Sequence, residues 1–165
     1  MVPTFNLLLP YITEDLPGVG GRIRASIDDF VVEEVSSIEP SGTGDHLYIS
    51  LTKEGLTTRE VQVKLAELFD LRPQEIGIGG LKDKDARATQ VFSLMFERGK
   101  IEPEVAVRSV EEDIDVRVNW AKYHGVKFRA GHLLGNSFRV LVSDIKISRE
   151  GRWTVPKESR ITSIR

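Results

Sequence analysis

The residues that could carry chemistry are concentrated in one short segment, Gly79-Gly80-Leu81-Lys82-Asp83-Lys84-Asp85-Ala86-Arg87-Ala88-Thr89-Gln90. Its two glycines would allow a sharp turn and leave room for a ligand. Asp83 lies between two lysines, and nearby cations favour the ionised form of a carboxylate. An ionised, positioned carboxylate can act as a nucleophile. A solvated, charged hairpin turn has the same composition, so the segment alone leaves both interpretations open.

Other common catalytic chemistries find little support in the sequence. The chain has no cysteine, which excludes disulfides, thiolate zinc sites and cysteine nucleophiles. Its three histidines, His46, His124 and His132, lack metal-ligand spacing. Asp83 and Asp85 are not followed by further oxygen ligands at useful intervals. We therefore predict no metal site.

The clearest element that could position this segment is a helix over residues 57–70. Thr57 with Glu60 three residues later forms the pattern of a capping box. Apolar residues then recur at helical spacing, and Arg72-Pro73 ends the pattern. The apolar stripe consists of Val61, Leu65, Leu68 and Phe69.

Strands are predicted on both sides of this helix. Residues 30–35 are rich in β-branched side chains, and residues 46–52 alternate apolar and polar side chains. Residues 76–78 run into the glycine pair, and 90–96 form the next strand, while 105–110, 113–123 and 138–142 add further strand signal. One main helix among many strands predicts an α+β fold with a mostly antiparallel sheet.

The length of 165 residues suits one folded domain. Residues 10–21 are rich in glycine and proline and predict a loop. Residues 148–165 carry many charges without a usable period, so we predict a domain over residues 1–147 and a surface or disordered tail. The first twelve residues resemble neither a signal peptide nor a membrane span. These features predict a cytoplasmic protein without membrane association.

The charges are distributed unevenly along the chain. Residues 1–115 contain 12 Lys+Arg and 22 Asp+Glu, which gives this acidic half a net charge of −10. Residues 116–165, the basic half, contain 11 Lys+Arg and 3 Asp+Glu, a net charge of +8. The two values add up to the net charge of −2. A basic half favours a polyanionic partner such as nucleic acid. Folding could instead interleave the two halves and cancel the field.

Three motifs in order resemble the TruD family of pseudouridine synthases. The central segment resembles the family's Gly-x-Lys-Asp signature, Arg24 to Glu34 resembles its basic residue followed by Asp-Phe-x-Val-x-Glu, and Gly135-Asn136-Ser137-Phe138 resembles Gly-Asn-x-Phe. Gly44 to Leu47 and Lys53 to Arg59 also resemble the family's sequence between these motifs. The resemblance spans roughly residues 22–142.

This resemblance implies roles for individual residues. Asp83 matches the catalytic aspartate, with Lys82 beside it in the signature. Phe30, Asn136 and Phe138 match positions that line the uridine pocket, and Arg24 matches the basic residue near the carboxylate. We expect Arg24 to form a salt bridge with Asp83. We also expect the carboxylate to be buried and the phenylalanines to offer a stacking surface for an extruded base.

The implied function is the isomerisation of uridine to pseudouridine in transfer RNA, at uridine 13, without a cofactor. Asp83 would either attack C1′ or abstract a ribose proton to give a glycal. Family members are usually at least twice this length and carry a later Asn-Tyr-Phe-Gly segment that this sequence lacks. We therefore also expect a truncated, non-catalytic RNA-binding or self-associating remnant as an alternative, with homo-oligomerisation or strand exchange.

A third interpretation is an unrelated small α+β interaction domain. It predicts that Arg24, Phe30, Asp83, Asn136 and Phe138 do not converge on one cleft. Their convergence would remove this interpretation.

Overall fold

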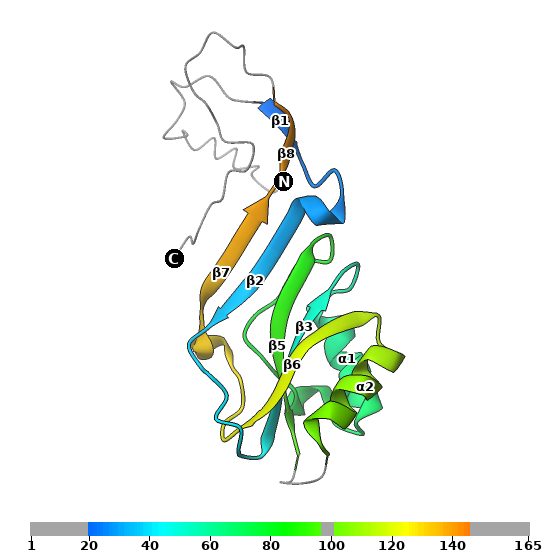
Figure 1. The fold of residues 1–165 in the computed structure, drawn as a ribbon, viewed down its shortest axis with the longest axis vertical. Coiled ribbons are helices and arrows are strands. Elements are labelled where there is room, and N and C mark those ends of the chain that lie inside the picture. Colours follow the sequence, from blue (N-terminus) through cyan, green and yellow to red (C-terminus); the bar gives the residue numbers. More distant parts are fainter. Residues whose placement is uncertain (1–19, 97–100, 146–165) are drawn as a thin grey trace, which may run out of the picture.

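The computed structural model describes residues 20–96 and 101–145. Within them, a mixed sheet has the strand order β6-β3-β5-β2-β7, and two α-helices pack against one of its faces (Figure 1). The long strands are β2 (Phe30–Ser36), β3 (His46–Lys53), β5 (Arg87–Met95), β6 (Val116–His124) and β7 (Leu133–Val140). The α+β class with a mostly antiparallel sheet is confirmed.

The pairing of β5 explains where the central segment lies. One edge of β5 pairs antiparallel with β3 over eight residues. Its other edge is shared, because its start pairs parallel with β2 and its middle pairs antiparallel with the short β4 (Gly77–Ile78). The segment between β4 and β5 therefore forms a loop that returns the chain to the start of β5, next to β2.

Helix α1 (Thr58–Leu68) begins as predicted. The Thr57 hydroxyl accepts from the Glu60 amide at 3.1 Å, and the Glu60 carboxylate accepts from the Thr57 amide at 2.6 Å. Val61 and Leu65 are fully buried against the sheet. The capping box and the apolar stripe are both confirmed.

The strand expected over residues 105–110 is wrong, because these residues lie in a second helix, α2 (Pro103–Asp113). Pro103 occupies the first turn of this helix, where its fixed φ and missing N–H are tolerated. Ala106 and Val110 are both buried, at the i, i+4 spacing of one helical face. The valines of residues 105–110 therefore belong to a short amphipathic helix. The fold has two main helices instead of one.

The helix-covered face contains the main apolar core. Leu47, Ile49 and Leu51 of β3 are fully buried there, together with Phe92 of β5. Alternation along each strand places polar residues such as Ser50 on the opposite face. The two faces of the sheet therefore differ in chemistry.

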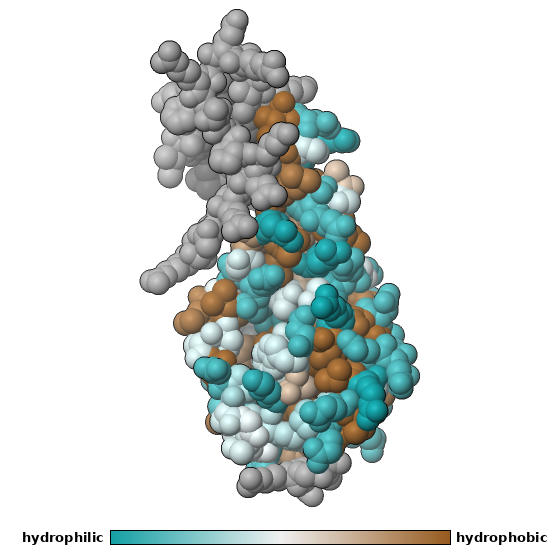
Figure 2. Space-filling model, in the orientation of Figure 1, coloured by the Kyte–Doolittle hydropathy of each residue, from teal (hydrophilic) through white to brown (hydrophobic). Residues whose placement is uncertain are grey.

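A small second sheet extends the end of β2 and β7. Strand β1 (Gly20–Ile23) pairs antiparallel with β8 (Val142–Ile145). Ile23, Leu141 and Ile145 are exposed at this end, where Figure 2 shows hydrophobic surface. Among the described strands of the main sheet, β6 and β7 are the edges. These features do not test oligomerisation or strand exchange, which stays a prediction.

Three short 3-10 helices complete the described elements: η1 (Ile27–Asp29), η2 (Pro73–Glu75) and η3 (Ala130–His132). The loop predicted over residues 10–21 lies almost entirely outside the described residues, and Gly20 and Gly21 belong to β1. The predicted tail, 148–165, lies outside them altogether. No helix in residues 20–96 and 101–145 is long and apolar enough to cross a membrane.

Candidate active site

Five side chains from distant parts of the sequence meet beside β2 and β7, the last two strands in the order of the sheet. Phe30, Asp83, Asn136 and Phe138 line a cavity of about 120 Å³, together with Val32, Leu81 and Lys82. Arg24 joins them through its ion pair with Asp83. The predicted convergence is therefore observed, and it argues against an unrelated interaction domain.

The expected Arg24–Asp83 salt bridge is present. Arg24 Nη2 lies 2.5 Å from Asp83 Oδ2. The guanidinium carbon of Arg24 also lies 3.9 Å from the centre of the Phe30 ring, which is a cation–π contact. One guanidinium therefore holds the carboxylate and one aromatic wall of the cavity together. Arg24 reaches this position from a left-handed backbone (φ 59°), which is uncommon for a residue other than glycine.

The two phenylalanines come from adjacent strands. Val32 pairs with Phe138 and Phe30 pairs with Val140 in the antiparallel β2–β7 ladder, so both rings lie on one face. Their centroids are 6.0 Å apart in an edge-to-face arrangement. Both rings are only partly buried, so they also present surface to the cavity.

Asn136 contributes a polar group whose contacts are incomplete. It lies opposite Glu34 in the β2–β7 ladder. Its Oδ1 atom is buried and has no hydrogen-bond partner among the described residues. A buried polar atom without a partner is uncommon in folded proteins. Asn136 therefore lines the cavity with a carbonyl oxygen that is buried and, within the described part of the chain, unpaired.

Asp83 is more open than expected. Its side chain is 56% exposed, whereas we expected a buried carboxylate. More than half of the Asp83 side chain is therefore accessible to solvent. The acid still lies at the aromatic walls, as the hypothesis requires.

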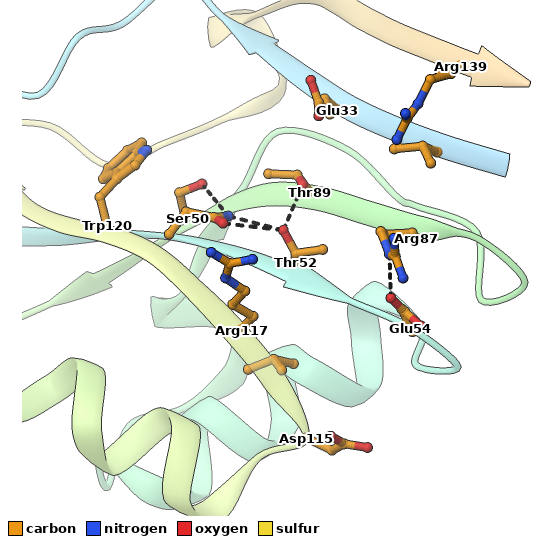
Figure 3. A pocket seen from close by; sticks show the side chains of 13 residues that line it. Glu33, Ser50, Thr52, Glu54, Arg87, Thr89, Asp115, Arg117, Trp120 and Arg139 are labelled. Atoms are coloured by element: carbon orange, nitrogen blue, oxygen red, sulfur yellow. Dashed lines mark hydrogen bonds and ion pairs between the residues drawn. The ribbon is translucent and has the colours of Figure 1, made fainter. Parts of the chain in front are cut away.

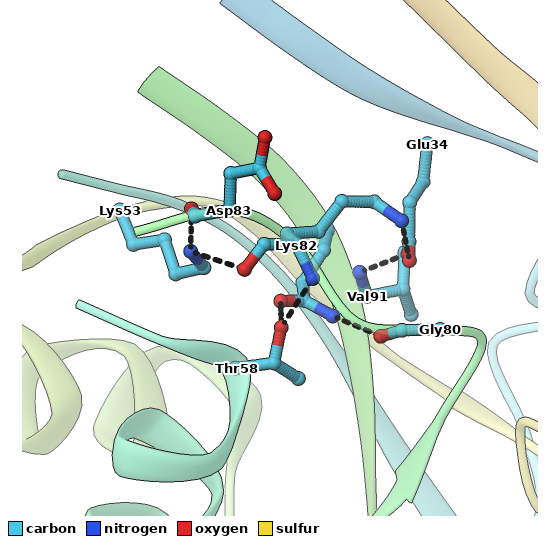
Figure 4. A network of polar contacts seen from close by, with 8 residues as sticks. Glu34, Lys53, Thr58, Gly80, Lys82, Asp83 and Val91 are labelled. Atoms are coloured by element: carbon cyan, nitrogen blue, oxygen red, sulfur yellow. Dashed lines mark hydrogen bonds and ion pairs between the residues drawn. The ribbon is translucent and has the colours of Figure 1, made fainter. Parts of the chain in front are cut away.

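The two lysines that flank Asp83 in sequence bind other carboxylates. Lys82 Nζ lies 3.0 Å from Glu34 Oε1, and both side chains are almost completely buried, at 5% and 1% exposed. Lys84 Nζ lies 3.5 Å from a Glu60 carboxylate oxygen. The cation that contacts the Asp83 carboxylate is therefore Arg24, whereas Lys82 lines the cavity with its ammonium directed to Glu34 (Figure 4).

Arg87, the third cation of the segment, also binds other carboxylates. Its guanidinium forms ion pairs with Glu54 and Asp28. It is therefore occupied by two acidic side chains of the same chain, and it does not pair with Asp83.

Gly79 is required for a different reason than expected. Gly79 and Gly80 do not adopt positive φ values. A Cβ atom on Gly79 would lie 2.7 Å from the ring of Phe128, which is fully buried. The absence of a side chain at Gly79 is thus needed for packing against Phe128 and does not leave space for a ligand.

A network of polar side chains lies under the loop that carries Asp83, and the sequence does not predict this network (Figure 4). Thr58 Oγ1 accepts from the Lys82 amide at 2.8 Å and donates to Gln90 Oε1 at 2.7 Å. Gln90 Nε2 donates to the Gly80 carbonyl at 3.2 Å. Lys53 Nζ donates to the Asp83 carbonyl at 2.8 Å. These contacts join residues 10–32 positions apart, which no local pattern reveals.

A larger hollow of about 900 Å³ lies on the opposite face of the sheet and contains none of the six predicted site residues (Figure 3). Thr52 and Thr89 share a hydrogen bond of 2.8 Å there, and Asn119 donates to Thr52 at 3.1 Å. Opposite charges balance on this face, so it lacks the basic character expected of a phosphate-binding surface. Its charged lining consists of Arg87, Arg117, Arg139, Glu33, Glu54 and Asp115.

The basic half is only partly within the described residues. Residues 116–145 carry five Lys+Arg and one Asp, a balance of +4, and the remaining +4 of the +8 lies in residues 146–165. Arg139 and Arg117 of this half lie beside acidic residues in the larger hollow. Folding therefore interleaves part of the two halves. In the described part of the chain, no group of three or more His, Asp or Glu side chains could hold a metal ion.

Comparison with known proteins identifies a family for this chain. The family model described as tRNA pseudouridine synthase D (TruD) matches residues 7–162. The chain is 46% identical to tRNA pseudouridine synthase D of Thermus thermophilus over 133 residues, which cover 81% of this chain and 36% of the relative. It is 38% identical to the protein of that name from Anaeromyxobacter dehalogenans over 141 residues, covering 86% of this chain and 39% of the relative.

A solved structure supports the fold. The crystal structure of a Methanosarcina mazei protein assigned to tRNA pseudouridine synthase D matches with a TM-score of 0.66 and 29% identity, covering 81% of this chain and 29% of that one. The chain thus spans little more than a third of the length of the curated relatives it matches. The family match covers nearly the whole chain, and we conclude that the chain belongs to the tRNA pseudouridine synthase D (TruD) family.

Proposed function

We propose that this chain carries the catalytic aspartate of a transfer RNA pseudouridine synthase, and that Asp83 is that residue. The observation on which the proposal depends is the meeting of Asp83, Arg24, Phe30, Phe138 and Asn136 around one cavity. Isomerisation breaks the N1–C1′ bond of uridine and joins C5 to C1′, while C5 loses its hydrogen to solvent as a proton and N1 gains a proton. The reaction needs no change of oxidation state, so the side chains of the site can supply its chemistry.

Asp83 would act as an ionised carboxylate. Its ion pair with Arg24 at 2.5 Å fixes the direction in which the carboxylate points. The carboxylate would either attack C1′ or take a proton from the ribose to give a glycal. Either route requires that the target nucleotide leave its stack and enter the cavity.

The cavity walls suit a single extruded pyrimidine. The partly exposed rings of Phe30 and Phe138 offer stacking surface, worth about 1–3 kcal/mol per base. The Asn136 side chain, whose Oδ1 atom has no partner among the described residues, can bind the polar edge of uracil, because an amide offers both a donor and an acceptor. Lys82 would support the cavity through its ion pair with Glu34.

The direct test compares Asp83→Asn with Asp85→Asn. Asp85 is also exposed and lies two residues further on, so its substitution is a matched control. Release of tritium from transfer RNA labelled at uridine C5 should fall at least about 1,000-fold in Asp83→Asn and change little in Asp85→Asn. Retained turnover in Asp83→Asn would remove Asp83 from the mechanism.

The choice of uridine 13 in transfer RNA is part of the same proposal. A transfer RNA with cytidine at position 13 and tritiated uridine elsewhere should release no tritium. A cytoplasmic location would give the chain access to this substrate.

The non-catalytic alternative is the second candidate, because the Asp83 side chain is 56% exposed. It predicts that the chain binds transfer RNA, or associates with itself, without tritium release. Measuring RNA affinity and oligomeric state alongside tritium release separates the two candidates. Turnover by this chain would exclude the non-catalytic alternative.

A further inference from the structure

Lys53, the last residue of β3, is a lysine buried inside the molecule. It is 1% exposed and ranks among the largest fully buried side chains. A fully buried lysine is rare unless its charge is compensated. Burial lowers the pKa of Lys53, and the negative charge of Asp83 partly opposes this shift. Such a costly group indicates a specific role for its contacts.

The ammonium of Lys53 binds backbone carbonyls from two loops. Nζ donates to the Leu56 carbonyl at 2.6 Å and to the Asp83 carbonyl at 2.8 Å, and the Lys82 carbonyl lies at 3.4 Å (Figure 4). Among the described residues no carboxylate lies within ion-pair distance of Nζ. The positive charge is therefore directed at peptide oxygens, and one of them belongs to the residue that carries the reactive acid.

These contacts tie the loop before α1 to the loop of Asp83. The Gly55 amide also donates to the Lys84 carbonyl at 3.2 Å, which adds a second connection between the two loops. The backbone oxygen of Asp83 is held by Lys53 while its carboxylate points away from Lys53 (Figure 4). Lys53 thus lies where it can set the direction of Asp83 without contacting the substrate.

We propose that Lys53 is a positioning residue for Asp83, whose ammonium fixes the backbone at Lys82 and Asp83 so that the carboxylate stays beside Arg24 and the Phe30 ring. The inference rests on the proposed role of Asp83 for its catalytic consequence. Its structural part, the fixing of the loop by a buried charge, stands on the contacts of Nζ alone.

The first experiment replaces Lys53 by Met, which retains length and apolar character but removes the charge. A loss of positioning by about 1 Å lowers rates about 100-fold, so kcat should fall about 100-fold while the KM for transfer RNA stays within about threefold. In the same variant, the amides of Lys82 and Gly55 should exchange with solvent at least about 10-fold faster. The amide of Leu65 in α1 should exchange as in the unchanged chain.

The second experiment restores the charge at the same position. Lys53→Cys introduces the only thiol, because the chain has no cysteine. Alkylation of the unfolded variant with 2-bromoethylamine, followed by refolding, creates a lysine analogue. Iodoacetamide provides a neutral control of similar length. We expect the aminoethylated chain to recover most of the lost kcat and amide protection, and the iodoacetamide product to recover neither.

The outcomes separate this inference from the proposed function. Normal kcat and normal loop exchange in Lys53→Met would overturn the role of Lys53 while leaving Asp83 catalytic. Equal recovery with both reagents would also overturn it, since the charge would then be unnecessary. If the unchanged chain releases no tritium, the proposed function fails for this chain, and the hydrogen exchange of Lys82 and Gly55 decides the role of Lys53 by itself.

Discussion

Two regions on the same face of the sheet are built from different kinds of side chain. Where α1 and α2 cover the sheet, the buried side chains are apolar, as with Ile49 and Phe92. Under the Asp83 loop, several buried side chains are instead polar and bonded, as with Lys53 and Gln90. The first region can stabilise the fold by apolar burial alone, whereas the second uses hydrogen bonds to hold one loop in place.

The largest effect on folding should come from the apolar region. Phe92→Ala removes a fully buried ring from the core, which should lower the free energy of unfolding by about 3–5 kcal/mol. Urea denaturation followed by circular dichroism measures this. Met95→Ala on the same strand is the control, since Met95 is 55% exposed and should cost little. Equal losses in the two variants would contradict the placement of the core.

The buried ion pair of the polar region should give the next effect. Glu34→Gln leaves the Lys82 ammonium buried without its countercharge, which should cost about 3 kcal/mol of unfolding free energy. Adding Lys82→Met to this variant removes the uncompensated charge and should restore part of the loss. A double-mutant cycle measured by urea denaturation tests this. If the double variant is no more stable than Glu34→Gln, the pair does not behave as a buried unit.

The Arg24–Asp83 pair should separate stability from activity. Both side chains are partly exposed, at 36% and 56%, so Arg24→Gln should change the free energy of unfolding by less than about 1 kcal/mol. Under the proposed function, tritium release should nevertheless fall at least about 10-fold, because the carboxylate loses its partner. Parallel urea and tritium assays check both parts. Arg22→Gln, which breaks an exposed pair with Asp144, is the matched control and should leave tritium release unchanged.

The smallest effect should come from the cap of α1. Hydrogen bonds from Thr57 lower the pKa of Glu60 below its ordinary value of 4.5. Because the folded-state pKa is the lower one, the stability contributed by the ionised carboxylate is present above about pH 4.5 and is lost as the pH falls through the folded value. Glu60→Gln should therefore flatten the acid limb of a plot of stability against pH. An unchanged acid limb would argue against this contribution.

Features encoded by neighbouring residues are predictable from the sequence, and those encoded by distant residues are not. The capping box of α1 depends on Thr57 and Glu60, three residues apart, and its prediction is confirmed. The second helix is missed because residues 105–110 are few and also fit a strand pattern. Lys82 is expected to act beside Asp83, but its partner Glu34 lies 48 positions earlier, on β2.

The resemblance to a family predicts which distant residues come together, but it assigns roles only to residues within its motifs. It places Asp83 and Arg24 together with the aromatic walls, and the structure brings these residues to one cavity. Lys53 lies in a segment between the motifs that also resembles the family, but the resemblance assigns it no role, and its contacts with the Asp83 loop depend on the pairing of β3 with β5. The support for the carboxylate is therefore visible only in three dimensions.

The pairing of β2 with β7 has a consequence for how the chain is made. Phe30 and Phe138 are 108 positions apart, and they form walls of the same cavity. At a synthesis rate of about 5–20 residues per second, the second wall leaves the ribosome roughly 5–20 s after the first. Through that interval β2 has no β7 to pair with, and its open edge can bind other chains. The pairing of β7 with β2 therefore completes the cavity and covers the open edge of β2 at the same time.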